Sequence, residues 1–336
     1  MTRVLVVRLS AMGDLVQSLG PVRALHEARP DLELCFVTQR ESAPLLCGLP
    51  FVANVVEHDR RGGIRAWLRT RASMRRLACD FALDLQGNWK SAACAFLSGA
   101  RERIGAAGPW RQEPASRALL TRLVAVDGPR HPGLVGLAIV RELAPSARAT
   151  APKLCATEEE VAAAAGAVRA HGIDVSRPFV VALLGRSGDP RSLKHGAIAA
   201  AMAGSRPVLV VLGPQEHNIP TPEGAVVMRQ QRGQLRMLVG LGEVLRRCGG
   251  EVLGGDQGPV HVLAAAGASC TVWFGAQDPA RTASPLVRVL QHPEPPSCMP
   301  CSRMRCSHPQ GPVCMDFVAS EGREVPPPNW FQQRAR

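Results

Sequence analysis

The sequence contains no tyrosine among its 336 residues, and aromatic residues together make up only 4%. Single-stranded nucleic acids are held by aromatic side chains interleaved among basic ones, and zinc-finger, RNP and basic-zipper patterns are also missing here. No apolar run has the length of a membrane-spanning helix, and no signal-peptide pattern opens the chain. These absences predict a cytoplasmic protein with no nucleic-acid partner.

Positive charge and apolar residues are what the chain has in abundance. Its formal net charge is +12, and 46% of its residues are hydrophobic. This length and composition allow two domains of ordinary size, each with its own core. A strong positive balance predicts an anionic partner, such as a phosphorylated substrate or an anionic membrane surface, and the scarcity of aromatics disfavours nucleic acid.

The stretch from Met1 to Asp14 predicts a strand, a turn and a helix in immediate succession. Residues 3–9 read RVLVVRL, which is typical of a buried strand, and an apolar pattern of helical spacing starts at Val16. Asp14 would then lie at the carboxyl end of a parallel sheet, where open α/β sheets bind ligands. Asp14 is a candidate catalytic base or, equally on local pattern, the N-cap of the helix.

The first half of the chain alternates predicted strands with predicted helices, which indicates a parallel sheet with right-handed crossovers. A loop is expected over residues 109–114. Further strands are expected at 32–38, 52–57 and 81–85, and helices at 64–77, 89–97 and 134–143.

A segment over 144–152, rich in Pro, Ala and Thr, predicts the domain boundary. Thr157, with Glu160 three residues on, fits a capping box that opens the next helix, which we expect to end at Ala170. The predicted domains are residues 1–150 and 151–320, followed by a loosely held tail over 321–336. The second domain is expected to have strands at 179–184, 207–212, 225–229, 251–254 and 269–274, and helices at 194–202, 236–247 and 260–266.

A second candidate site is the run GGDQGPVH that starts at Gly254. Gly258 permits a tight turn and close approach of a ligand, and Pro259 suits the start of a helix. The free N–H groups of the first helical turn form an anion site, which His261 could extend to a phosphate or ribose. The alternative is an ordinary capped helix with a histidine that faces the core.

Three further features have weaker patterns. The loop at 185–188, with Ser187, precedes Lys194 and could hold a diphosphate or be a solvated loop; its spacing is not that of a P-loop. After the strand at 81–85, Gln86, Asn88 and Lys90 could bind substrate hydroxyls or cap the following helix. An arginine-rich stretch runs from Arg60 and Arg61 to residue 76, and it is either a solvated face or an anion-binding one.

Four of the eleven cysteines gather near the C-terminus, at Cys298, Cys301, Cys306 and Cys314. Four thiols over a short span in a reducing compartment suggest a structural tetrahedral zinc site. Unligated thiols or a redox-labile pair are the alternatives. The other cysteines stand in apolar contexts and are expected to be small core residues.

Taken in order, these motifs resemble glycosyltransferase family 9, the ADP-heptose:lipopolysaccharide heptosyltransferases. The resemblance covers most of the chain. Its anchors are the opening strand with SxMGD, DLQG followed by Lys90-Ser91, GDxGPxH from Gly255, and FGxxDP from Phe274. The cysteine cluster also looks like one found in many members of that family. The chain departs from the family pattern in three places. Lys194 is followed by His195-Gly196 instead of Trp-Pro, Gln257 stands in place of threonine, and the Pro-rich segment 213–222 lacks a clear second glycine.

The resemblance implies a GT-B fold, in which two Rossmann-like domains face each other across a cleft. The N-terminal domain would bind a phosphorylated lipid A-core acceptor at the inner membrane surface, and the C-terminal domain a nucleotide-sugar such as ADP-heptose. Transfer would be inverting, with Asp14 as general base and no cofactor required for catalysis. The implied nucleotide-sugar site is Ser187, Lys194, Asp256, Gly258, Pro259 and His261, with Glu216 as a candidate ribose contact. The implied acceptor site is Ser10, Met12, Gly13, Gln86, Asn88, Lys90, Arg60 and Arg61. Two alternatives stay open, namely a GT-B transferase with another nucleotide-sugar and a divergent nucleotide-binding protein without transfer activity.

Overall fold

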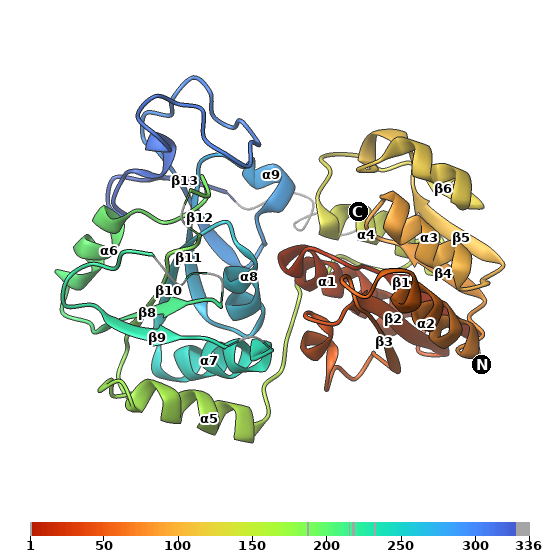
Figure 1. The fold of residues 1–336 in the computed structure, drawn as a ribbon, viewed down its shortest axis with the longest axis horizontal. Helices are drawn as coiled ribbons and strands as arrows, with labels where there is room; N and C mark the ends of the chain where they lie inside the picture. Colours follow the sequence, from red (N-terminus) through yellow and green to blue (C-terminus); the bar gives the residue numbers. More distant parts are fainter. Residues whose placement is uncertain (1, 187, 215, 217–218, 232, 327–336) are drawn as a thin grey trace. The chain divides into compact units, whose positions relative to one another are not determined.

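The chain folds into two compact units that divide between Pro152 and Lys153. The computed structural model describes residues 2–186, 188–214, 216, 219–231 and 233–326. Each unit is built around one sheet with helices on both of its faces (Figure 1). The α/β class that the sequence predicts is confirmed.

The first unit contains a parallel sheet of six strands in the order β3-β2-β1-β4-β5-β6. The apolar run at 4–7 in β1 is fully buried, because a parallel sheet is covered on both faces. Central β1 directs the β1–α1 turn to the carboxyl edge of the sheet. The strands are β1 (Thr2–Val7), β2 (Leu32–Gln39), β3 (Asn54–His58), β4 (Phe81–Asp84), β5 (Glu102–Ala106) and β6 (Arg122–Val124).

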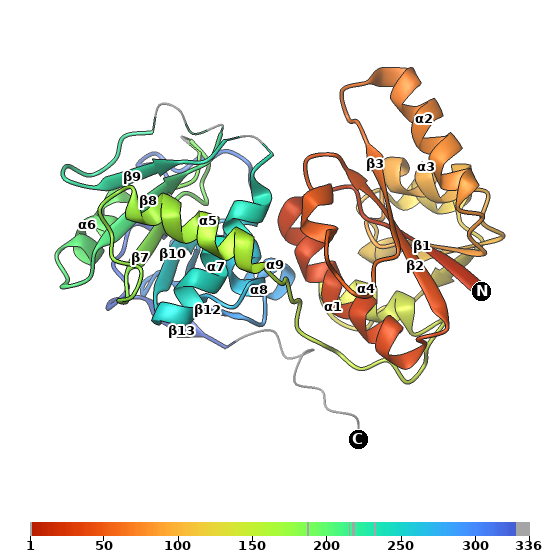
Figure 2. The same cartoon turned by 90° about the horizontal axis from the view of Figure 1, so that it is seen from below.

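Helices α2 and α3 cover one face of this sheet, and α1 packs against α4 on the other (Figure 2). Met74 of α2 and Cys94 of α3 share one core cluster with Leu5 of β1. Gly136 of α4 lies against Pro21 of α1, where a Cβ atom would be 3.0 Å from the proline ring. The helices are α1 (Met12–Ala28), α2 (Gly63–Arg76), α3 (Trp89–Leu97) and α4 (Pro132–Val140), with 3-10 turns η1 (Ala43–Leu46), η2 (Gly108–Trp110) and η3 (Pro114–Leu119).

The second unit contains a seven-stranded sheet in the order β13-β12-β11-β10-β7-β8-β9. All neighbours are parallel except β13, which runs antiparallel to β12. The tail predicted to be loosely held from 321 onward is therefore paired at residues 323–325, while 327–336 lie outside the described residues. The strands are β7 (Val180–Leu183), β8 (Val208–Leu212), β9 (Val226–Arg229), β10 (Glu251–Gly255), β11 (Ser269–Phe274), β12 (Val287–Gln291) and β13 (Arg323–Val325).

Helices α5, α7 and α8 pack on one face of the second sheet, and α6 with the 3-10 turn η4 packs on the other. The capping box predicted at Thr157 is confirmed: its side chain accepts from Glu160 N–H, and Glu160 accepts from Thr157 N–H. The elements are α5 (Glu158–Arg169), α6 (His195–Met202), α7 (Leu235–Cys248), α8 (Gly258–Ala265), α9 (Pro279–Thr282) and η4 (Val313–Met315).

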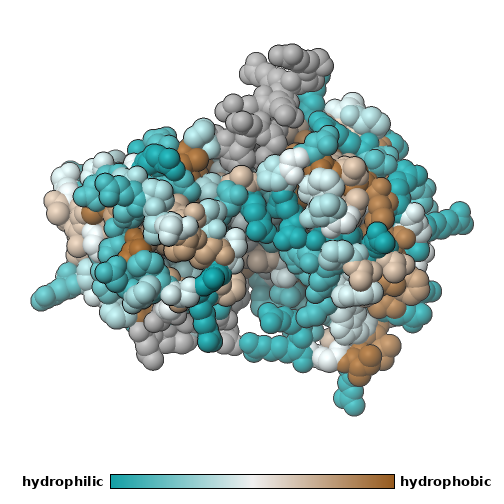
Figure 3. Space-filling view, turned by 90° about the horizontal axis from the view of Figure 1, so that it is seen from above, coloured by the Kyte–Doolittle hydropathy of each residue, from teal (hydrophilic) through white to brown (hydrophobic). Residues whose placement is uncertain are grey.

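Several boundaries differ from the sequence prediction. The sequence did not predict strands β5, β6, β12 and β13, and both ends of the loop expected at 109–114 lie in 3-10 turns. The helix expected at 260–266 begins two residues earlier, at Gly258, so Pro259 is its second residue. Among the described residues, no helix combines the length and apolar character needed to cross a bilayer. Figure 3 shows a face on which hydrophilic residues predominate and hydrophobic areas are small and scattered.

Candidate functional site

Asp14 lies in the first turn of α1, immediately beyond the carboxyl end of β1. The N-cap of α1 is Ala11, so the prediction that Asp14 is the N-cap is wrong. Asp14 instead occupies the third helical position, and its Oδ2 accepts a hydrogen bond from Ala11 N–H at 3.3 Å. About a quarter of the side chain, 27%, is exposed. The carboxylate therefore supports the helix start and also reaches solvent.

Arg8 is the strongest partner of Asp14. Its Nη2 lies 2.5 Å from Asp14 Oδ2, and its side chain is only 4% exposed. Its Nη1 donates to the carbonyl oxygen of Leu85, at the end of β4. Both contacts of Asp14 use Oδ2, so Oδ1 takes part in neither of them. Arg8 thus fixes the carboxylate in one orientation relative to the sheet edge.

Gln86 ties the end of β4 to the turn that precedes α1. Its Oε1 accepts from Leu9 N–H at 2.8 Å and from Ser10 N–H at 3.2 Å, and its Nε2 donates to Ser10 Oγ at 3.3 Å. The structure thus brings together two predicted acceptor residues, Ser10 and Gln86. Because Gln86 is 7% exposed and its amide is engaged in these bonds, its visible role is to position the Asp14 turn.

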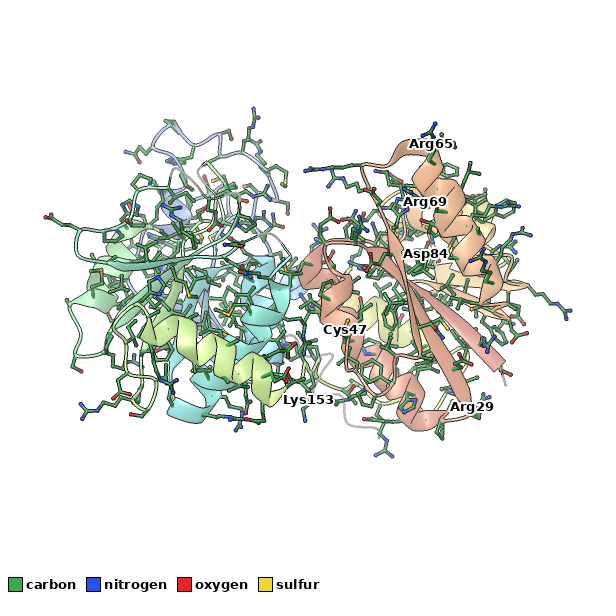
Figure 4. All side chains as sticks on the ribbon, turned by 60° about the horizontal axis from the view of Figure 1, so that its bottom comes forward. Arg29, Cys47, Arg65, Arg69, Asp84 and Lys153 are labelled. Atoms are coloured by element: carbon green, nitrogen blue, oxygen red, sulfur yellow. The ribbon has the colours of Figure 1, made fainter. Side chains whose placement is uncertain are left out.

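A buried ion pair lies beneath this turn. Arg111 Nη2 is 2.8 Å from Asp84 Oδ2, and both side chains are fully buried. Asp84, at the end of β4 (Figure 4), also accepts from the N–H groups of Gln86 and Gly87. Arg111 donates further to Ser116 Oγ. A charge so fully buried is tolerated only when it is paired and hydrogen-bonded, as this one is.

The other predicted acceptor residues belong to α1, to the start of α3 and to the turn before α2. Asn88 caps α3, since its Oδ1 accepts from Ser91 N–H at 3.0 Å, which is the capping alternative. Lys90 is exposed in the first turn of α3. Met12 and Gly13 form the first turn of α1 beside Asp14. Arg60 and Arg61 are exposed in the turn between β3 and α2.

Asp256 and His261 form a buried pair in the second unit. Asp256 follows β10, and its Oδ1 lies 3.0 Å from Nε2 of His261, with both side chains at most 6% exposed. His261 is therefore buried, as the alternative of a histidine that faces the core predicts, and it is paired with a carboxylate. Its Nδ1 is buried without a hydrogen-bond partner among the described residues, so the protein leaves one polar atom at this helix start unsatisfied.

The loop after β7 packs tightly onto the start of α8. A Cβ atom on Gly185 would lie 1.8 Å from the Gln257 side chain, and one on Gly255 would lie 1.7 Å from the carbonyl oxygen of Arg191. Glycine is required at Gly255 by the close approach of backbone, whereas at Gly185, where the Gln257 side chain could move, the φ of +85° is what favours glycine. Gln257, where the family pattern has threonine, donates from Nε2 to that same Arg191 carbonyl at 3.4 Å.

Lys194 is the N-cap of α6, because its ψ of 152° is extended. The prediction that the helix includes Lys194 is therefore wrong by one residue. Leu193 N–H donates to the carbonyl of Leu184, which fixes Lys194 just beyond β7, the strand next to β10. Within the described residues, the Lys194 ammonium forms no ion pair. Ser187, the other predicted residue of this loop, lies outside the described residues.

Glu216 follows β8, the next strand along the same sheet edge. Burial raises the pKa of its carboxyl group, against the opposing effects of the Gly213 N–H and Arg186. The ends of β10, β7 and β8 therefore carry Asp256, Lys194 and Glu216 at one edge of the second sheet.

Among the described residues, no group of three or more His, Cys, Asp or Glu side chains is placed so that it could hold a metal ion. The thiols of the four C-terminal cysteines are still near one another. Burial raises the pKa of Cys314 to about 11, and charges on the other three cysteines add to this effect. The zinc site stays a prediction from spacing, and no step proposed below depends on it.

Arg8 and Arg111 are the residues that sequence reasoning missed. A charged residue at the end of an apolar strand run was the available signal for Arg8, because buried arginines are almost always paired. Nothing local indicates that Arg111 pairs with Asp84, since 27 residues separate them.

Neither a protein-family profile nor a curated protein sequence matches this chain. Solved structures match it in fold. A glycosyl transferase family 9 structure from Veillonella parvula gives a TM-score of 0.71 at 17% identity, over 86% of this chain and 85% of that one. ADP-heptose lps heptosyltransferase II of E. coli gives 0.67 at 19% identity, over 87% of this chain and 90% of that one. E. coli heptosyltransferase WaaC with ADP-2-deoxy-2-fluoro heptose gives 0.62 at 18% identity, over 87% and 93%.

The fold is thus the two-domain GT-B fold of glycosyltransferases, as the resemblance implies. In particular, it is the fold of the family 9 and heptosyltransferase structures, and the likeness extends over most of both units. Identities of this size establish the architecture, while function depends on the residues at the two sheet edges.

Proposed function

We propose that this protein is an inverting glycosyltransferase that transfers heptose from ADP-heptose to a phosphorylated lipid A-core acceptor. The observation that carries the proposal is the fold likeness, which includes both sheets and relates the chain to enzymes described as heptosyltransferases. One of these was solved with an ADP-heptose analogue, which favours an ADP-sugar as donor. In this proposal the first unit binds the acceptor and the second unit binds the donor.

Asp14 is the proposed general base. A carboxylate is the basic form of this side chain and can accept a proton as a new bond forms. Because Arg8 and Ala11 N–H both bind Oδ2, we assign the proton to Oδ1. The acceptor oxygen bonds to the anomeric carbon, the bond from that carbon to the diphosphate oxygen breaks, and the hydroxyl proton passes to Asp14.

The second unit would stabilise the leaving ADP. The N–H groups at the start of α8 and the Lys194 ammonium interact more strongly as negative charge grows on the departing diphosphate. His261 Nδ1, which has no protein partner among the described residues, is the proposed contact of this helix start with the nucleotide-sugar. Asp256 holds the His261 ring in place through Nε2. No metal ion is required in this scheme.

The acceptor phosphates would be held by the exposed cations of the first unit, Arg60, Arg61 and Lys90. Such an acceptor is anchored in a bilayer, so we infer that the protein acts at the cytoplasmic surface of the inner membrane. Ser10 and Gln86 would contribute by holding the turn that carries Asp14.

Replacement of the proposed base tests the mechanism. Asp14→Asn keeps the size of the side chain but removes its basicity, and kcat for heptosyl transfer should fall about 10²- to 10⁴-fold. ADP affinity should be unchanged, because the nucleotide is assigned to the other unit. Asp31→Asn is the matched control, since Asp31 is an exposed aspartate that pairs with Arg29. Full transfer activity in Asp14→Asn would refute the assignment of the base.

A further inference from the structure

Helix α2 and the turn before it form an unusually dense cationic segment. Residues 60–76 contain seven arginines and no acidic residue. None of these arginines takes part in an ion pair within the described part of the chain, and one of them, Arg75, donates to the Leu97 carbonyl. Like charges three and four residues apart destabilise a helix. This segment therefore concentrates positive charge that no ion pair among the described residues offsets.

The inner side of α2 is already occupied. Ala66, Thr70 and Met74 recur every fourth residue and are buried against the sheet. Trp67 packs on His58, with ring centroids 4.6 Å apart. These contacts fix which side of the helix faces solvent.

The outer side of α2 carries two exposed aliphatic residues. Ile64 is 72% exposed and Leu68 is 57% exposed. Each is two positions from buried Ala66, which at about 100° per residue is about 200° around the helix. They are one turn apart and lie side by side. Two adjacent large aliphatic side chains on one side of a helix form a small apolar strip within this cationic segment.

Arg65 and Arg69 flank this aliphatic pair on the exposed surface (Figure 4). We define Ile64, Arg65, Leu68 and Arg69 as the outer face of α2. Guanidinium groups beside aliphatic side chains on one helix match the boundary of a bilayer, where phosphate headgroups meet acyl chains. Nucleic acid would use the arginines but has no counterpart for the aliphatic pair, and no aromatic side chain lies in this face.

We propose that the outer face of α2 binds the surface of an anionic lipid bilayer. Ile64 and Leu68 enter the boundary between headgroups and acyl chains, and Arg65 and Arg69 bind lipid phosphates. The binding is a property of the free protein and needs neither donor nor acceptor. It can therefore fail while the proposed transferase activity stands, and the reverse also holds.

Flotation of the full-length chain with vesicles tests the proposal. We expect binding to vesicles of phosphatidylcholine mixed with phosphatidylglycerol, and little binding to phosphatidylcholine alone. Each basic residue near an anionic surface contributes about fivefold to partitioning, which corresponds to about 1 kcal/mol. Arg65→Gln/Arg69→Gln should accordingly lower partitioning about 25-fold, and added salt should weaken binding of the unmodified protein.

Substitution of the aliphatic pair separates a bilayer from other anionic partners. Ile64→Ser/Leu68→Ser keeps every charge. It should still lower vesicle binding about tenfold or more, because the variant transfers less apolar surface from water into the bilayer. Met304→Ser is the matched control for Ile64, since Met304 is equally exposed at 72% and also lies between two arginines. Arg177→Gln/Arg288→Gln removes two exposed charges from the second unit. Both controls should bind like the unmodified protein.

Three results would overturn the proposal. The first is equal binding to neutral and anionic vesicles. The second is unchanged vesicle binding in Ile64→Ser/Leu68→Ser, with thermal unfolding confirming that the variant is folded. The third is binding of an RNA oligonucleotide that matches vesicle binding and is lost only in the arginine variant, which would assign the face to nucleic acid.

Discussion

Arg111 is fully buried, and its charge is compensated by Asp84 and by Ser116. Asp84 in turn orients the backbone N–H groups of Gln86 and Gly87. Through Gln86 the pair supports the turn that carries Asp14. A side chain distant from any substrate can therefore control the position of the proposed base.

Removal of one partner of this pair should be strongly destabilising. Arg111→Met leaves an uncompensated buried carboxylate, and the free energy of unfolding should fall by about 3–5 kcal/mol. Denaturant unfolding measures the change. Arg122→Met is the control, because Arg122 pairs with Glu102 and Glu142 at the surface and should cost at most about 1 kcal/mol. Equal losses in the two variants would show that the buried pair has no special role.

Some site residues could be predicted from the sequence and others could not. Asp256 follows an apolar strand directly, and Asp14 lies just beyond the turn that follows one, so local pattern places both at sheet edges. Lys194 comes only after a loop that follows β7, as the N-cap of the next helix. The roles of Ser10 and Gln86 do not follow from pattern, because their polar atoms are engaged in bonds within the protein. Asn88 takes the capping role that the sequence offered as one of two alternatives. Arg8 was missed because its partners come from α1 and β4, and strand patterns carry no information on such pairing.

At the scale of elements, the start of α5 is fixed by more than its capping box. Arg236 of α7 lies 2.5 Å from Glu160, the acidic member of that box. The hydrogen bond from Arg236 lowers the pKa of Glu160 below its usual value, against the opposing effect of burial and with help from Thr157. The pair thus joins two neighbouring helices that pack on the same face of the sheet.

A lowered carboxyl pKa gives stability a defined dependence on pH. Its contribution is fully present above the ordinary pKa of glutamate and is lost as pH falls through the lowered value in the folded protein. Glu160→Gln should reduce the free energy of unfolding by about 0.5–1 kcal/mol at neutral pH, and the difference should vanish at strongly acidic pH. Urea unfolding at a series of pH values measures it. Glu159→Gln, an exposed neighbour in the same helical turn, should show no such dependence.

Long elements with strong periodicity were predictable, and short edge strands were not. The run at 269–274 and the helix at 89–97 have the predicted bounds because their apolar patterns are continuous. Two of the three residues of β6 are exposed, so its sequence shows no strand pattern. β13 exists only through its antiparallel pairing with β12, a tertiary contact that its own residues do not indicate.

At the scale of the whole molecule, the proposal that the protein binds an ADP-sugar can be tested with nucleotides alone. ADP should raise the unfolding temperature more than UDP, GDP or CMP, because a ligand that binds only the folded state stabilises it by mass action. At about 100 times the dissociation constant this amounts to about 2.7 kcal/mol. A stronger effect of UDP would contradict ADP-heptose as donor.

Hydrogen exchange locates the same binding event. ADP should protect amides at 188–194 and 255–261 and leave those of 8–14 unchanged. Protection confined to the first unit would reverse the assignment of donor and acceptor.

The division into two units can be predicted from the sequence, because two alternating series of strands and helices are visible in it. The order of the strands within each sheet cannot be predicted in this way, because it depends on pairings that no local pattern shows.

The bonds that hold the Asp14 turn have a consequence for how the protein matures. Arg8 binds Leu85 and Leu9 binds Gln86, in each case across 77 residues. Contacts between residues so far apart in sequence form late, because a long loop must first close at a cost in conformational entropy. A nascent chain therefore contains the residues of β1 and α1 well before β4 arrives to lock the turn between them. The proposed base is synthesised well before β4, yet it takes its final position only when the sheet is assembled.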